Sequence, residues 1–247
     1  AGKNPKTSAA YRSQKTADQF LGLITNQELL NDWRLSEGYE QDVVILRKIY
    51  STEAKRLDGL LNEILNLWGD RKLQKQTAVF FIGDHGEMLA EQNEISHAAV
   101  LFEGALKFPM LIRFPGQIGG LKTITDQVQL ETAVQIVEGS MSGAITENNL
   151  ISYVQSNKQD TLVLRDCANK WRGLRSKNEW KYLVRLGDDE RLLFDLRKDP
   201  GENKNVADEN PGEVMAFEQE YWQNYSRFSR LPARHCQPTP AAEATTE

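Results

Sequence analysis

The stretch Thr77-Ala-Val-Phe-Phe-Ile-Gly-Asp-His-Gly-Glu87 joins a short apolar run to a cluster of polar residues. Residues 77–82 form a continuous run rich in β-branched and aromatic side chains, which predicts a strand buried on both faces, as in a parallel sheet. The run ends at Gly83, and Asp84 and His85 follow directly. In open α/β sheets, ligands bind just beyond the carboxyl ends of the strands. The stretch therefore predicts both a central strand and the place of the chemistry.

The segments on either side of this stretch complete an alternation of helix and strand. Residues 39–68 carry apolar side chains at intervals of three and four with charges between them, which predicts an amphipathic helix. A second buried strand is predicted at residues 108–114, followed by a helix over residues 130–137. This alternation indicates an α/β fold. We expect the two strands to be interior neighbours in one sheet, with the 39–68 helix packed on a face of it.

The pattern changes after residue 140. Residues 140–160 read as a linker, and four short strand-like runs follow, at residues 162–164, 171–174, 180–185 and 191–195. The last two flank a Gly-Asp-Asp turn and predict an antiparallel hairpin. A final helix is predicted over residues 211–228. We therefore divide the chain into the core at 1–145, a small α+β C-terminal subdomain at 146–232, and a disordered tail at 233–247.

Charge and hydropathy exclude two kinds of partner. The formal net charge is -5, and no dense basic run is present, so a nucleic-acid partner is not expected. No stretch approaches the ~20 consecutive apolar residues of a membrane-spanning helix. The sequence carries no signal that would fix its localisation.

Asp84 and His85 are the first candidates for a metal site. A carboxylate and an imidazole side by side suit a divalent cation, and the flanking glycines allow the backbone to approach a ligand closely. A third candidate, His97, lies in a polar loop before the next apolar run. Histidine can donate or accept a proton near neutral pH, so His97 is a third candidate for the same site.

Four motifs in order resemble the sulfatase family of the alkaline phosphatase superfamily. The strand with Gly-Asp-His-Gly-Glu87 resembles the family signature, and Leu101-Phe-Glu-Gly-Ala-Leu-Lys-Phe-Pro-Met-Leu-Ile-Arg-Phe-Pro-Gly116 resembles the segment that follows it. The helix at 49–58 and the closing module between residues 172 and 205 resemble two further family motifs. The resemblance extends over residues 40–225. It implies a partial alkaline phosphatase-like core followed by a small antiparallel sheet plus helix as C-terminal subdomain.

The resemblance also implies roles for the candidate residues. Asp84 and His85 correspond to the family's ligands for a divalent metal, for which Ca²⁺ is the expected ion and Mg²⁺ or Mn²⁺ are the alternatives. His97 stands where many sulfatases carry a lysine, and it would donate to the ester oxygens or protonate the leaving alcohol. The implied reaction is the metal-dependent hydrolysis of sulfate esters.

The family's nucleophile is not expected in this chain. It lies near the family's N-terminus in a Cys/Ser-x-Pro/Ala-x-Arg motif, or is a Ser or Thr, just after an Asp-Asp metal pair. No Asp-Asp pair precedes Asp84, and Cys236-Gln-Pro-Thr-Pro240 has a proline in place of the arginine. We therefore expect a C-terminal half that is inactive by itself and that has a missing N-terminal half as its partner.

Two other functions remain open from the sequence. The first is a phosphodiesterase or phosphoglycerol-type transferase of the same superfamily, acting on a phosphate ester, because His97 replaces the usual lysine. The second is a non-catalytic protein that uses this scaffold for binding. The identity of the nucleophile would separate sulfatase from phospho-transfer chemistry, since covalent catalysis depends on it.

Overall fold

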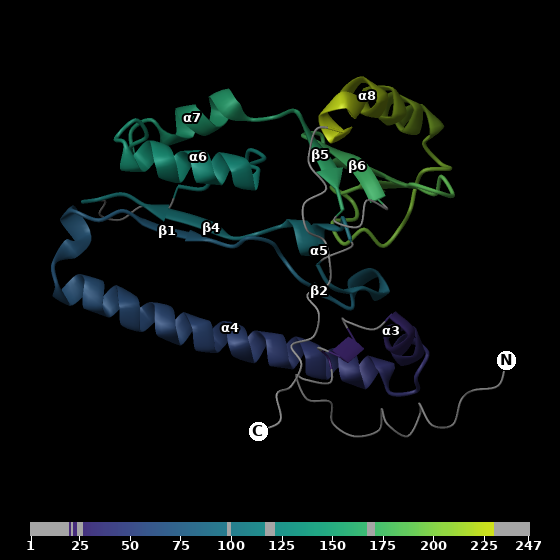
Figure 1. The fold of residues 1–247 in the computed structure, drawn as a ribbon, viewed down its shortest axis with the longest axis horizontal. Helices are drawn as coiled ribbons and strands as arrows, with labels where there is room; N and C mark the ends of the chain where they lie inside the picture. Colours follow the sequence, from purple (N-terminus) through teal and green to yellow (C-terminus); the bar gives the residue numbers. More distant parts are fainter. Residues whose placement is uncertain are drawn as a thin grey trace.

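The computed structural model describes residues 20, 22–23, 27–97, 100–116, 122–166 and 171–229. Figure 1 shows a long helix, α4 (Tyr39–Asp70), running along one side of the molecule below a pair of strands. Two helices lie on the other side of that pair, and the chain ends in a separate small sheet covered by α8 (Pro211–Ser229). Within these ranges, no helix is long and apolar enough to cross a membrane.

The start of α4 is anchored by the short helix α3 (Gln27–Arg34). Trp33 is completely buried, and its indole Nε1 donates a hydrogen bond of 3.0 Å to Oδ2 of Asp42, which is itself buried. A buried carboxylate needs such a partner, because desolvation without a hydrogen bond is costly. Around this pair the apolar residues of both helices form one cluster with Phe20, Leu23 and Ile95.

The two strands predicted from the apolar runs are present and are neighbours in one sheet, as expected, but their direction and burial differ from the expectation. β1 (Val79–Ile82) and β4 (Met110–Arg113) form an antiparallel two-stranded sheet, with Phe80 opposite Ile112. All four residues of β1 are only partly buried, and Leu111 of β4 is exposed. The predicted interior strands of a parallel sheet, buried on both faces, are therefore wrong for this structure. A continuous apolar run specifies neither the direction of its neighbour nor whether both faces are covered.

Helix α4 extends over the predicted residues, but most of its length is not covered. Its apolar side chains at Leu57, Leu60, Ile64, Leu65 and Leu67 are 44–60% exposed. At its C-terminal end, the Arg113 guanidinium lies 4.4 Å from the ring centre of Trp68, which ties the helix to β4. The expectation that the helix packs along a face of the sheet is thus wrong for its middle turns.

Helices α6 (Leu130–Met141) and α7 (Leu150–Asn157) cover the strand pair on the side away from α4 (Figure 1). They enclose a core of Phe114, Ile136, Ile145 and Val154, against which Phe80, Met110 and Ile112 pack. Helix α7 corrects the prediction of a linker over residues 140–160. Its last three residues, Gln155–Asn157, are polar and weaken the apolar periodicity on which that prediction depended.

The C-terminal region follows the prediction closely. Strands β5 (Thr161–Arg165), β6 (Trp171–Ser176), β7 (Trp180–Arg185) and β8 (Arg191–Asp195) form an antiparallel sheet in chain order, and β7–β8 is the predicted hairpin. Helix α8 packs on one face through Phe217 and Tyr221. The opposite face contacts the segment that follows β3 (Ile95–Ser96), through Leu101 and Phe102. The predicted division at residue 145 stays a prediction, and the tail at 233–247 lies outside the described residues.

Candidate active site

The candidate site is a turn that the chain makes on leaving β1. Its two ends are held by backbone hydrogen bonds to the segment around α5 (Glu103–Leu106): the Gly83 amide donates to the Pro109 carbonyl over 2.9 Å, and the Gly86 amide to the Ala105 carbonyl over 2.8 Å. Asp84 and His85 lie between these two anchors. The turn is therefore fixed at both ends while its middle is free to face solvent.

Gly86 is a glycine because the backbone of α5 lies too close for any side chain. A Cβ atom there would collide with the Gly104 carbonyl oxygen and would lie 2.6 Å from the Lys107 carbonyl oxygen. Real Cβ atoms do not approach backbone oxygens this closely, and backbone cannot move aside cheaply. The sequence pattern Asp-His-Gly thus reflects the packing of the site turn on α5.

Asp84 and His85 present their functional atoms side by side. The His85 Nε2 atom lies 3.6 Å from Oδ2 of Asp84. The other ring nitrogen, Nδ1, lies 2.7 Å from the Gly86 carbonyl oxygen. Because a carbonyl oxygen can only accept, Nδ1 carries the proton in the neutral ring and Nε2 presents its lone pair toward Asp84.

His97 comes from the other side of the site, directly after β3, and its ring stacks on that of His85. The ring centres are 3.6 Å apart at an interplanar angle of 27°. The His97 Nδ1 atom lies 3.0 Å from Oε2 of Glu87. The carboxylate accepts from Nδ1–H and leaves Nε2 as the free basic atom, which is how carboxylates orient catalytic and metal-binding histidines.

The structure therefore brings all three predicted site residues together and adds a fourth. Glu87 belongs to the same motif, but the sequence alone gives it no role. The signal that could have identified it is its place at the end of the Asp-His-Gly-Glu run, three residues after Asp84. His85, Glu87 and His97 offer ligand atoms that all lie within 4.8 Å of one another.

These residues fit a divalent cation. Neighbouring ligand atoms around such an ion lie about 3 to 3.5 Å apart, because bonds of about 2.0 to 2.6 Å meet at about 90°. The separation of 3.6 Å between Asp84 Oδ2 and His85 Nε2 is close to this value. The Asp84 side chain is 83% exposed, and its Oδ1 atom accepts a hydrogen bond of 3.1 Å from the His85 amide, which leaves Oδ2 as the oxygen nearest the His85 ring.

Comparison with known proteins agrees with this geometry. The family model described as Sulfatase matches residues 45–139, which include the site turn and His97. The chain is 28% identical over 198 residues to "Arylsulfatase K" of Xenopus laevis, covering 72% of this chain and 37% of that protein. Over these residues the chain is similar to the sulfatase family. Sulfatases generally bind a divalent metal, which accords with the donor set found here.

Two further comparisons cover most of this chain. It is 28% identical to "Choline-sulfatase" of Rhizobium meliloti (strain 1021) over 192 residues, covering 73% of this chain and 36% of that protein. The solved structure of a "2-O GAG sulfatase" superposes with a TM-score of 0.52 at 19% identity, covering 90% of this chain and 49% of that one, which shows the shared alkaline phosphatase-like fold. The chain spans little more than a third of the length of these curated relatives.

One short match to the nucleophile motif is present at residues 8–12. Ser8-Ala-Ala-Tyr-Arg12 has the letters of the Ser-x-Ala-x-Arg form. Ser8 lies outside the described residues, so the structure gives no distance between Ser8 and Asp84. A short motif match needs structural context before it indicates a function.

Proposed function

We propose that this chain forms the C-terminal part of a metal-dependent hydrolase of sulfate esters. In this proposal Asp84 and His85 bind the divalent cation, and His97 contacts the substrate. The observation that carries it is the stacking of His85 on His97 at 3.6 Å, which joins the metal-binding turn to the candidate proton donor in one site. The family match over residues 45–139 supports sulfate rather than phosphate esters as the substrate class.

His85 and Asp84 are arranged to hold the cation without rearrangement. The Nδ1 atom of His85 is occupied by the Gly86 carbonyl, so Nε2 is directed toward the Asp84 carboxylate. When bound, a divalent cation supplies Lewis-acid polarisation of ester oxygens. Ca²⁺ prefers oxygen ligands, whereas Mn²⁺ accepts imidazole nitrogen as well, so Mn²⁺ is the more sensitive probe for this pair.

His97 is positioned by Glu87 to act through Nε2. The Glu87 carboxylate holds the Nδ1 proton, and it also stabilises the ring when that ring is protonated. A protonated His97 can donate to a non-bridging oxygen of the ester or to the departing alcohol oxygen. Because the side chain is about two-fifths exposed, a substrate can reach it from solvent.

A second arrangement of the cation rests on the same cluster. The ligand atoms of His85, Glu87 and His97 lie within 4.8 Å of one another, a set that suits a transition metal better than calcium. Binding there would replace the hydrogen bond between Glu87 and His97. We favour Asp84 with His85, because their spacing already matches that of neighbouring ligands and no contact must be broken.

Calorimetric titration of Mn²⁺ and Ca²⁺ into the full chain tests the assignment. We expect a dissociation constant weaker than about 10⁻⁴ M, because few ligands are present and calcium takes about six or more. Asp84→Ala and His85→Ala should abolish binding, and Glu87→Gln should preserve it. Asp58→Ala on the exposed face of α4 is the matched control and should bind like the parent chain.

Two results would count against the assignment. If Glu87→Gln and His97→Ala abolish binding while Asp84→Ala does not, the cation belongs to the His-Glu-His cluster instead. If the unmodified chain takes up neither ion at millimolar concentration, the proposal of a metal site in this chain is wrong.

A further inference from the structure

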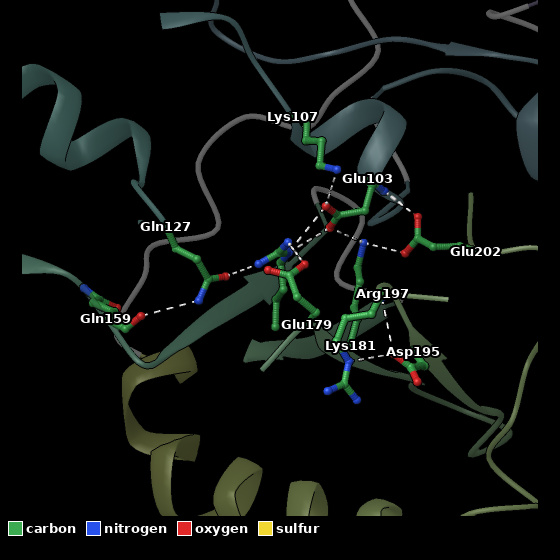
Figure 2. A network of polar contacts seen from close by, with 10 residues as sticks. Glu103, Lys107, Gln127, Gln159, Glu179, Lys181, Asp195, Arg197 and Glu202 are labelled. Atoms are coloured by element: carbon green, nitrogen blue, oxygen red, sulfur yellow. Dashed lines mark hydrogen bonds and ion pairs between the residues drawn. The ribbon is translucent and has the colours of Figure 1, made fainter. Parts of the chain in front are cut away.

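Three charged residues far from the site turn in sequence are almost completely buried beside α5. Glu103, Lys181 and Glu202 are 4%, 0% and 3% exposed, and we call them the buried charge cluster. Figure 2 shows Lys181 reaching from the C-terminal sheet to a position between the two carboxylates. Burying charge is expensive unless each group is paired, so these contacts constrain where the three side chains can lie.

The cluster links the sheet to α5 through short contacts. The Lys181 Nζ atom lies 2.7 Å from Oε1 of Glu202 and 3.2 Å from Oε1 of Glu103. Arg175 of the same sheet adds a contact of 3.2 Å between its Nε and Oε1 of Glu103. Lys107 is the third cationic side chain at Glu103, with its Nζ atom 3.3 Å from Oε2. Two cationic side chains of the sheet thus hold the first residue of α5.

Glu202 also holds the backbone of α5. Its second oxygen, Oε2, accepts a hydrogen bond of 2.6 Å from the amide of Glu103, the first residue of that helix. Both oxygens of Glu202 are therefore used as acceptors, one by Lys181 and one by α5. A glutamine has only one acceptor oxygen, so it could keep one of these contacts but not both.

Helix α5 is in turn the surface on which the site turn rests. The Gly86 amide donates to the Ala105 carbonyl, and the α5 carbonyls leave no room for a side chain at Gly86. The side chain of Met88, which is buried, lies against Gly104 on the same helix. A shift of α5 would therefore displace Gly86 and, with it, the neighbouring His85 and Glu87.

We propose that Lys181 and Glu202 are positioning residues that fix the site turn by holding α5 in place. The functional importance of this positioning rests on the proposed metal site. The positioning of α5 by Lys181 and Glu202 rests on the contacts alone. An apolar core of the same volume would tolerate small sliding movements. Ion pairs between the sheet and the helix restrict such sliding, because each pair keeps its two charged groups at contact distance. Residues that position metal ligands from outside also tune metal affinity.

Hydrogen exchange followed by mass spectrometry on the full chain tests the proposal. Lys181→Met and Glu202→Gln should speed exchange in residues 83–89 by about tenfold. The matched controls carry the same changes at exposed ion pairs of the same subdomain: Lys177→Met, whose partner is Asp160, and Glu209→Gln, whose partner is Lys204. Both controls should exchange like the parent chain.

The comparison with β5–β8 separates positioning from general loosening. In Glu202→Gln the sheet should keep its protection while residues 83–89 lose theirs. Equal exchange at 83–89 in the variant and the parent would overturn the proposal, and so would an equal loss across the sheet. If Lys181→Met does not fold, Glu202→Gln alone decides, because it keeps the size of the side chain.

Mn²⁺ titration provides the functional arm. We expect the dissociation constant to rise about tenfold in Glu202→Gln, as is usual for outer partners of metal ligands, and to stay unchanged in Glu209→Gln. An unchanged affinity in Glu202→Gln would show that the cluster does not act on the site. If the parent chain binds no Mn²⁺, the proposed metal site fails, and the exchange comparison still decides the positioning role.

Discussion

Glu103 keeps its charge in acid longer than an ordinary glutamate does. Burial by itself raises the pKa of this carboxyl, but Lys181 and Arg175 outweigh it and bring the pKa below the ordinary value of 4.5. Glu202 differs: burial and the neighbouring Glu103 charge raise its pKa, and the opposing effect of Lys181 does not outweigh them. A carboxyl with a lowered pKa stabilises the fold above its unfolded pKa and loses that contribution as the pH falls through the folded value.

The Glu103→Gln variant should therefore be less stable near neutral pH than in acid, relative to the parent chain. We expect a loss of about 2 kcal/mol in the free energy of unfolding at pH 7, the usual size for a hydrogen bond to a charged group. The loss should shrink as the pH falls below 4.5. Urea denaturation at several pH values measures both. Glu53→Gln, in an exposed pair with Arg56, is the control. A loss that is constant with pH would contradict the electrostatic explanation.

At this scale the sequence identifies some functional residues and not others. Asp84 and His85 are recognisable because they follow an apolar strand, where ligands bind in α/β sheets, and His97 is recognisable through the family resemblance. Lys181 and Glu202 look like any surface charges, since a charged residue in a one-dimensional pattern carries no sign of its burial. Their pairing joins positions that are far apart in the chain, and only the fold brings them together.

Among the elements, the packing of the site turn on α5 gives a direct prediction for Gly86. Gly86→Ala should destabilise the chain by about 1 to 3 kcal/mol, as overpacking does, because the added Cβ meets backbone oxygens that cannot move. Gly59→Ala in the middle of α4 is the matched control. Nothing lies within 4 Å of its Cβ position, so alanine should stabilise the helix by about 0.5 to 1 kcal/mol.

Thermal and urea unfolding of the two variants measure the contrast. If Gly86→Ala is as stable as the parent chain, the close contact between the turn and α5 is not present in solution. The same variant should also weaken Mn²⁺ binding, since the added methyl group pushes the turn that carries Asp84 and His85.

The elements that the sequence predicts best are those that interact with near neighbours in the chain. The β7–β8 hairpin is set by its own turn and is found as predicted. The pairing of β1 with β4 joins residues about thirty positions apart and came out antiparallel rather than parallel. Helix α7 was missed, because its stability comes from packing of Val154 and Leu150 on α6 rather than from a strong periodic pattern.

Within the described residues, apolar surface is left uncovered on α4 and beside the β1–β4 pair. The middle of α4 exposes five leucine and isoleucine side chains, and the β1–β4 pair has no third strand within the described residues. Exposed apolar patches and open strand edges usually mark places where another segment packs. The chain spans about 37% of the length of the first of its curated relatives, and we propose that the N-terminal half expected from the sequence packs on this surface.

We propose that this chain carries the metal-binding turn and His97 of a sulfatase without a working nucleophile. Enzymes remove about 8 to 23 kcal/mol from reaction barriers, and a cation held by few ligands supplies little of this without a covalent partner.

The most direct test is an assay of the purified chain on an aryl sulfate, with phosphate monoester and diester substrates in parallel, with and without Ca²⁺ or Mn²⁺. We predict hydrolysis no faster than in buffer for the parent chain and for Asp84→Ala and Ser8→Ala alike. Turnover of the aryl sulfate that disappears in Asp84→Ala would show that the chain is a complete catalyst. If Ser8→Ala also abolishes this turnover, Ser8 is the nucleophile and the chain is not a half-enzyme.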